Sequence, residues 1–216
     1  SRQAADAAAS VLVGRVSIGM DPRAATRVAA ERAAEVVAAL PSSTKDPDDG
    51  PACTFASAIV DGAGVTVGWV GDSRAYWLSS AGSCLLTRDD SWATQMVENG
   101  ELSAADAWAD HRAHVLTAWL GADAGAVEPR VAAFRPTVPG LVLVCTDGLW
   151  NHLPEPSDLA AVAAADRHNG GDGLGGRPIH VARRLLRAAL DAGGHDNVTA
   201  AVIPWPPPRA SREPGR

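Results

Sequence analysis

Apolar positions along the first forty residues recur at the spacing of helices. Residues 1–13 are alanine-rich with helical periodicity, and Pro22 suits the first turn of a second alanine-rich helix that runs to about residue 40. From Thr54 the period of the apolar positions changes to two, which is typical of strands. The pattern predicts one antiparallel meander of four short strands, over residues 54–60, 65–70, 74–78 and 84–87.

The second half of the chain mixes both periods. Helical patterns cover residues 92–99, 103–108, 157–165 and 177–192, and strand patterns cover residues 131–134, 141–146 and 198–203. Because strands of this length need a covering layer, and helices occur before, between and after them, the pattern predicts an α+β fold in which sheets pack against helices. Residues 167–176 are glycine-rich without phosphate-binding spacing, which predicts a flexible loop, and the proline-rich residues 205–216 predict a tail or linker.

Composition narrows the class of protein. A length of 216 residues with 46% hydrophobic residues fits a single domain, and a net charge of -6 without a basic stripe argues against nucleic-acid binding. Three scattered cysteines indicate neither a disulfide framework nor a zinc site, so a cytoplasmic protein is expected. No apolar run is long enough for a membrane span, and a start at Ser1 without a signal-peptide pattern suggests the interior of a longer protein.

One carboxylate stands directly after the most apolar strand pattern. The run Leu141–Thr146 ends in Asp147-Gly148, so a buried strand is expected to deliver Asp147 to the edge of a sheet, while Gly148 allows other backbone or a ligand to come close. A carboxylate in this position is costly unless it is paired, hydrogen-bonded or bound to a metal. On this stretch alone, an Asp that caps the following turn is an equally good interpretation.

A second carboxylate precedes a strand. Asp196 comes just before the pattern at residues 198–203, so both carboxylates reach the same sheet edge if the two strands are antiparallel neighbours. Carboxylates without paired histidines or cysteines form a hard-oxygen site that suits Mg²⁺ or Mn²⁺. The pair therefore predicts hydrolysis of a phosphate ester by water activated at a two-metal centre, and no motif of a protein nucleophile competes with it.

Other polar residues have simpler interpretations. Asp90 and Ser91 precede a helical pattern, so a role at the start of that helix is favoured for them. His111 and His114 lack a third potential ligand nearby in the sequence, so loop histidines are favoured over a zinc site.

Four motifs, in this order, resemble those of the PPM family, the metal-dependent type 2C protein serine/threonine phosphatases. They are Gly71-Asp72-Ser73-Arg74-Ala75-Tyr76, Leu86-Thr87-Arg88-Asp89-Asp90-Ser91, Cys145-Thr146-Asp147-Gly148-Leu149-Trp150 and Gly194-His195-Asp196-Asn197-Val198-Thr199.

The resemblance implies a fold, an activity and a set of site residues. The implied fold is an α-β-β-α sandwich of antiparallel sheets flanked by helices, over residues 1–204, with a flap-like insertion at about 88–121. The implied activity is the dephosphorylation of phosphoserine and phosphothreonine proteins at two Mg²⁺ or Mn²⁺ ions, and a partner serine/threonine kinase fits this role. By matching position, Asp147 and Asp196 are metal ligands and Asp89 helps to hold a looser third ion. The Gly-Asp-Ser-Arg turn is interpreted as architectural.

The chain departs from the family pattern at two places. The Asp-Gly-x-Gly-Gly motif, which supplies the aspartate that bridges both metals, is absent together with the first strands and the phosphate-binding arginine, so the fold is expected to be N-terminally truncated. Asn151 stands where the family often has a further aspartate for the third metal. This chain alone is therefore expected to be weakly active or inactive. The alternative hypothesis is a catalytically impaired, phosphatase-like module that binds or regulates phosphoproteins.

Overall fold

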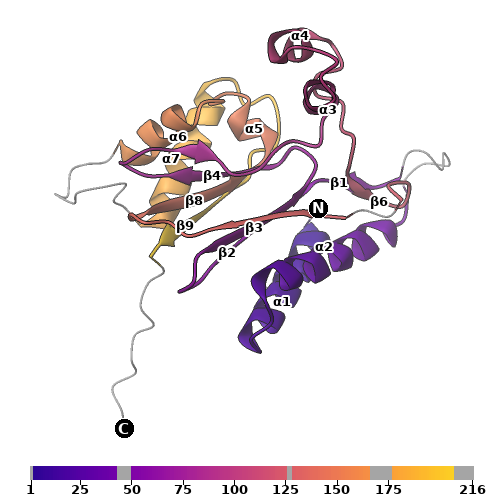
Figure 1. Cartoon of the computed structure of the whole chain (residues 1–216), viewed down its shortest axis with the longest axis horizontal. Helices are drawn as coiled ribbons and strands as arrows, with labels where there is room; N and C mark the ends of the chain where they lie inside the picture. Colours follow the sequence, from indigo (N-terminus) through magenta and orange to yellow (C-terminus); the bar gives the residue numbers. More distant parts are fainter. Residues whose placement is uncertain (1, 43–49, 126–127, 166–176, 207–216) are drawn as a thin grey trace.

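The computed structural model describes residues 2–42, 50–125, 128–165 and 177–206 (Figure 1). The glycine-rich segment at residues 167–176 and almost all of the proline-rich tail, both predicted from composition, lie outside the described residues. In the part of the chain that is described, no helix combines the length and apolar character needed to cross a membrane.

The helices and strands follow the predicted order closely. The helices are α1 (Arg2–Ser17), α2 (Pro22–Ala38), α3 (Trp92–Glu98), α4 (Ala104–Ala109), α5 (Asp147–Trp150), α6 (Pro156–Ala164) and α7 (Pro178–Asp191). The strands are β1 (Ala52–Cys53), β2 (Phe55–Val60), β3 (Val65–Val70), β4 (Arg74–Leu78), β5 (Cys84–Leu85), β6 (Leu120–Gly121), β7 (Arg130–Phe134), β8 (Gly140–Cys145) and β9 (Ala200–Trp205).

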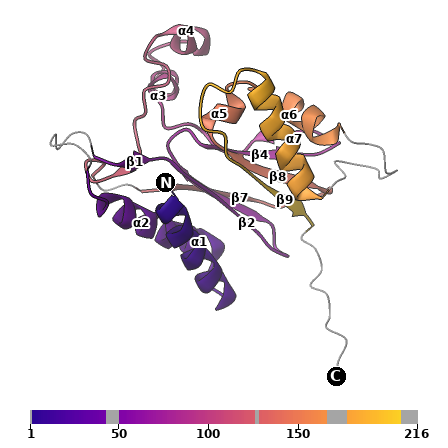
Figure 2. The ribbon, with the colours of Figure 1, turned by 180° about the vertical axis from the view of Figure 1, so that it is seen from behind.

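Two antiparallel sheets lie face to face between helices. One has the strand order β2-β3-β7 and the other the order β5-β4-β8-β9, while β1 and β6 form a separate short pair. Figures 1 and 2 show α1 and α2 on the outer side of the first sheet and α5, α6 and α7 on the outer side of the second. The expected α+β class and the α-β-β-α sandwich are therefore confirmed.

Alternating side chains on the strands explain the layers. On β4, Trp77 packs between the two sheets with Val67 and Val142, whereas its neighbour Tyr76 points into the core beneath α5, α6 and α7, where Leu143 also lies. Because successive side chains of a strand point to opposite faces, each central strand supplies two cores at once. This explains why every residue of β3 and of β4 is buried.

Helix α2 begins and packs as its sequence indicates. The Asp21 carboxylate accepts a hydrogen bond from the Ala24 amide at 3.0 Å, and Pro22 occupies the first turn. Thr26 of α2 lies against Gly68 of β3, where a Cβ atom would collide with the Thr26 methyl group. The small residues therefore let this helix approach the sheet closely.

The predicted single meander is wrong. β2 pairs with β3 in one sheet, but β4 pairs with β5 and β8 in the other, so the chain crosses between sheets at residues 71–73. Gly71 has a φ of +94°, and its Cβ would approach Thr54, both of which favour glycine at this crossing. Turn signals locate the ends of strands, but they do not determine which sheet the next strand joins.

Helices α3 and α4 project from the end of the sandwich (Figure 1). They share a small core of Ala93, Ala107 and Ala113, against which Trp92, Met96 and Leu102 pack. We call residues 92–115 the flap, which lies inside the segment predicted as a flap-like insertion. That the flap influences substrate choice stays a prediction.

Candidate active site

The two carboxylates singled out from the sequence lie at the same end of the second sheet. β8 and β9 are antiparallel neighbours, with Cys145 opposite Ala200. Beyond that pair, the Thr146 amide donates to the Thr199 carbonyl oxygen at 3.1 Å, and the Thr146 hydroxyl donates to the Asn197 carbonyl oxygen at 3.0 Å. Asp147 follows Thr146 directly and Asp196 precedes Asn197 directly. The strand arrangement on which the sequence argument depended is confirmed.

Asp147 and Asp196 have different surroundings. Asp147 is partly buried in the first turn of α5, and its Oδ1 accepts from the Gly148 amide at 2.9 Å. The N-cap position belongs to Thr146, so Asp147 does not cap the turn as the simpler interpretation supposed. Asp196 is exposed, and its Oδ1 accepts from the Asn197 amide at 2.6 Å. That the two residues share a cation stays a prediction.

Gly148 allows the two segments that carry the carboxylates to lie close together. A Cβ atom at this position would lie 2.6 Å from the carbonyl oxygen of Asn197 and 3.0 Å from its carbonyl carbon. Since these are backbone atoms, they cannot move aside as a flexible side chain would. The prediction that Gly148 allows other backbone to come close is confirmed, because the backbone of Asn197, just before β9, lies against it.

Asp72 is a further acidic residue near the candidate site, which the sequence interpretation did not select. Burial, followed by the negative charges of Asp147 and Asp89, raises the pKa of Asp72 to about 6. The indole nitrogen of Trp150 donates to the Asp72 carbonyl oxygen at 3.0 Å, which fixes the inter-sheet crossing against α5. The carboxylates of Asp147 and Asp89 therefore lie close enough to act on that of Asp72. The Gly-Asp-Ser-Arg turn has the predicted architectural role and also supplies a carboxylate.

Asp89 is engaged by an arginine. Its two carboxylate oxygens accept from Arg74, Oδ1 from Nε at 2.9 Å and Oδ2 from Nη2 at 2.7 Å, and both residues are buried. The Arg74 guanidinium also lies 3.5 Å from the centre of the Trp150 ring. These contacts give Asp89 a structural role. That Asp89 helps to hold a third ion stays a prediction.

Asp90 and Ser91 have structural roles. The Ser91 hydroxyl caps α3 by accepting from the Thr94 amide at 3.4 Å, as predicted. Asp90 is buried and accepts from the Gly71 amide at 3.0 Å and from Nε of Arg130 at 2.6 Å. Asp90 therefore joins the inter-sheet crossing to β7.

Residues with the chemistry of soft-metal ligands or nucleophiles are dispersed. Among the described residues, no group of three or more His, Cys, Asp or Glu side chains is arranged to hold a metal ion. His111 and His114 are exposed on the flap, and the three cysteines are free thiols. Burial raises the pKa of the Cys145 thiol to about 12, so Cys145 is poorly suited to act as a nucleophile.

A cleft of about 730 Å³ leads to the carboxylate end of the second sheet. Its walls come from α1, from the start of β2 and from the facing ends of β8 and β9. Thr146, Asn197 and Thr199 line the part of the cleft nearest to Asp147 and Asp196, and Arg2 is the one charged residue in its lining. The cleft therefore gives an extended segment access to this end of the sheet.

The chain is similar in sequence to bacterial phosphatases. It is 29% identical, over 156 residues, to the serine/threonine phosphatase stp of Listeria welshimeri. The aligned residues make up 72% of this chain and 57% of that protein, so the chain spans little more than half the length of this relative. No protein-family model matches the chain.

Solved structures share the fold. The PPM Ser-Thr phosphatase MsPP from Mycobacterium smegmatis, solved in complex with cacodylate, superposes with a TM-score of 0.69 at 26% identity, over 91% of this chain and 79% of that one. The catalytic domain of the serine threonine protein phosphatase PstP, solved with two manganese ions, gives a TM-score of 0.64 at 21% identity, over 91% of this chain and 80% of that one.

Proposed function

We propose that this chain, which is similar in sequence and fold to PPM-type serine/threonine phosphatases, is part of a protein that hydrolyses phosphoserine and phosphothreonine esters in other proteins. The observation that supports the proposal is that the segments carrying Asp147 and Asp196 lie side by side at one end of the paired strands β8 and β9. The related phosphatase from Listeria welshimeri supports the same reaction class.

The site has the kind of ligand that divalent cations prefer, but too few ligand side chains in the described ranges of the chain to hold them. Asp147, Asp196 and Asp72 offer the carboxylate oxygens that Mg²⁺ and Mn²⁺ prefer, and the related PstP domain was solved with two manganese ions. However, the described residues contain no cluster of three such groups. When bound, two such ions would supply an activated water and neutralise the charge on the phosphoryl oxygens.

This chain's own residues hold the carboxylates in place. Thr146 ties the end of β8 to the segment that carries Asp196, and the Trp150 indole fixes the backbone of Asp72. Burial, followed by repulsion from the Asp147 carboxylate, raises the pKa of Asp72. A bound cation would relieve that repulsion.

We further propose that a segment outside this chain supplies the bridging carboxylate. The cleft between α1, β2 and β9 reaches the site from one side and has room for such a segment. Removal of a bridging carboxylate leaves the charge of the ions uncompensated and weakens their binding. The chain on its own should therefore turn over phosphopeptides poorly.

Replacement of Asp72 by Asn should have opposite effects without and with metal. In EDTA, loss of the repulsion should raise the melting temperature by roughly 1–3 °C, a small value because Asp72 is only partly buried. In excess Mn²⁺, the metal-dependent rise in melting temperature should shrink, because a cation stabilises the folded state only as far as it binds there. Differential scanning fluorimetry of the whole protein measures both changes.

The matched control for Asp72→Asn is Asp158→Asn, which removes an exposed acid from the first turn of α6. The control should leave the metal-dependent rise unchanged. An equal response of the two variants to Mn²⁺ would contradict a part for Asp72 in cation binding.

The experiment that tests the function compares this chain with the protein's full reading frame. Phosphate release from a phosphothreonine peptide is measured with Mn²⁺, with Mg²⁺ and with EDTA. We expect metal-dependent release by the full protein and much slower release by the chain alone. Metal-independent binding of the phosphopeptide without turnover would instead support the phosphatase-like binding module. A kinase partner and a cytoplasmic location remain predictions.

A further inference from the structure

Trp150 connects the carboxylate end of the sheet to several other elements. Its side chain is buried, and it lies on the same short helix as Asp147. Its indole nitrogen donates to the Asp72 carbonyl oxygen, and the guanidinium of Arg74 stacks on its ring. A displacement of Trp150 would therefore be transmitted to Asp72, Asp147 and the Arg74–Asp89 pair.

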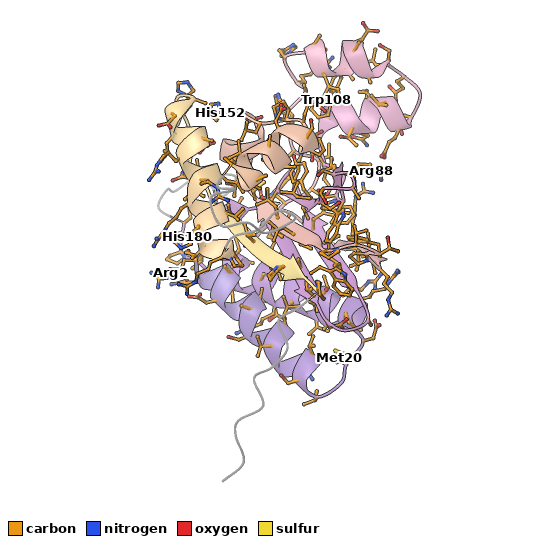
Figure 3. The ribbon with its side chains drawn as sticks, turned by 90° about the vertical axis from the view of Figure 1, so that its left-hand side faces the viewer. Arg2, Met20, Arg88, Trp108, His152 and His180 are labelled. Atoms are coloured by element: carbon orange, nitrogen blue, oxygen red, sulfur yellow. The ribbon has the colours of Figure 1, made fainter. Side chains whose placement is uncertain are left out.

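The flap also contacts Trp150 through two aromatic side chains. The ring of His114 lies 6.2 Å, centroid to centroid, from the Trp150 ring, at an interplanar angle of 35°. The ring of Trp108, at the end of α4, lies 5.8 Å from that of His114. Figure 3 shows Trp108 where the flap meets the rest of the molecule. The three rings form a series from α4 through the returning segment of the flap to α5.

Two backbone hydrogen bonds close the base of the flap, and an ion pair between Arg88 and Glu98 of α3 ties the flap to the sandwich. Trp92 donates its amide to the Val115 carbonyl oxygen at 2.8 Å, and Thr117 donates its amide to the Asp90 carbonyl oxygen at 2.9 Å. The backbone bonds lie at the base of the flap and the Arg88–Glu98 pair holds α3, so none of these ties contacts α4. The helices pack on one another through alanines, a small core that favours movement of the flap as a unit.

We propose that His114 and Trp108 are positioning residues that hold the flap in a fixed orientation against Trp150, beside the carboxylate end. The series of rings sets the angle of the flap, and with it the surface that a folded phosphoprotein meets on approach. Hydrolysis of a small phosphate ester should be insensitive to this angle. The first part of the inference concerns the flap alone, and the part about substrate rests on the proposed function.

Hydrogen exchange tests the positioning directly in the chain as described. Aromatic pairs of this kind stabilise modestly, so replacing His114 by Ala should raise the exchange rates of amides in α4 and residues 110–115 by about 3- to 10-fold. Trp108→Ala should act in the same direction. Exchange in α1 should stay unchanged, because α1 packs on a core that contains neither Trp150 nor any flap residue.

Two variants distinguish the stacking of the His114 ring from a general effect of substitutions in residues 110–115. His111→Ala removes an exposed histidine from the same segment, whose recorded contact is with Asp110, and should leave exchange in α4 unchanged. His114→Phe keeps a ring and should retain most of the protection seen in the unchanged chain. Unaltered exchange in His114→Ala, equal losses in His111→Ala, or no rescue by Phe would each overturn the inference.

Kinetics of the full protein test the consequence for substrates. His114→Ala should raise the KM for a phosphorylated protein about 3- to 10-fold while leaving kcat/KM for a phenyl phosphate ester unchanged. Equal losses on both substrates would contradict the effect on substrate orientation. Absence of all turnover would contradict the proposed function, and the exchange experiment would still decide whether the rings hold the flap.

Discussion

Replacing Asp147 by Asn should lower metal-dependent phosphate release by the full protein at least about 100-fold. The change preserves the size of the side chain and the acceptor oxygen that faces the Gly148 amide, so α5 should still form. It removes the negative charge that we expect a divalent cation to meet at the end of β8. Initial rates on a phosphothreonine peptide over a range of Mn²⁺ concentrations measure the effect.

Two comparisons make the Asp147 result specific. Asp158→Asn removes a charge from an exposed position on α6 and should keep full activity. Thermal unfolding in EDTA should show Asp147→Asn at least as stable as the unchanged protein, because a charge that repels Asp72 is lost. An active Asp147→Asn variant with unaltered dependence on Mn²⁺ would rule out the proposed role of Asp147.

Replacing Arg74 by Met should cost about 3–5 kcal/mol in the free energy of unfolding. Met keeps the apolar stem but leaves the Asp89 carboxylate, 5% exposed, without the guanidinium that pairs with both of its oxygens. The stack on Trp150 is lost as well. Because an unpaired buried charge has no access to water, this effect should exceed that of any exposed ion pair. Urea denaturation followed by tryptophan fluorescence measures it.

The exposed pair between Arg32 and Glu35 on α2 provides the control for Arg74. Replacing Arg32 by Met should change the unfolding free energy by less than about 0.5 kcal/mol. A double variant, Arg74→Met with Asp89→Leu, should recover much of the loss, since it removes both charges together. A loss below about 1 kcal/mol for Arg74→Met alone would show that Asp89 does not depend on Arg74.

The sequence predicted elements better than it predicted their assembly. The ranges 65–70 and 74–78 match β3 and β4 residue for residue, because both runs are rich in β-branched and aromatic residues and are bounded by glycine, aspartate or serine. The sheet that each strand joins was predicted incorrectly. Packing between layers decides whether β4 folds back on β3 or crosses over, and packing between layers has no local signature in the sequence.

The error about Asp72 has the same origin. In a hairpin turn Asp72 would face solvent, whereas in a crossing between sheets it lies next to Asp147. The ion pair between Asp89 and Arg74 could not be predicted from the sequence either, because it joins side chains 15 positions apart across that crossing. By contrast, the placement of Asp147 and Asp196 at one end of neighbouring strands could be predicted, because each residue adjoins a strongly apolar strand pattern.

The order of strands in the sandwich also has a consequence for handling the purified protein. Among the described residues, β2 and β9 each pair with a single neighbouring strand, β3 and β8 respectively. A terminal strand of this kind presents outward amide and carbonyl groups that can template pairing with a further extended polypeptide. Concentrated solutions of the isolated chain should therefore be prone to self-association by strand addition, and charged or proline substitutions on the outward side of β2 are a direct means of suppressing it.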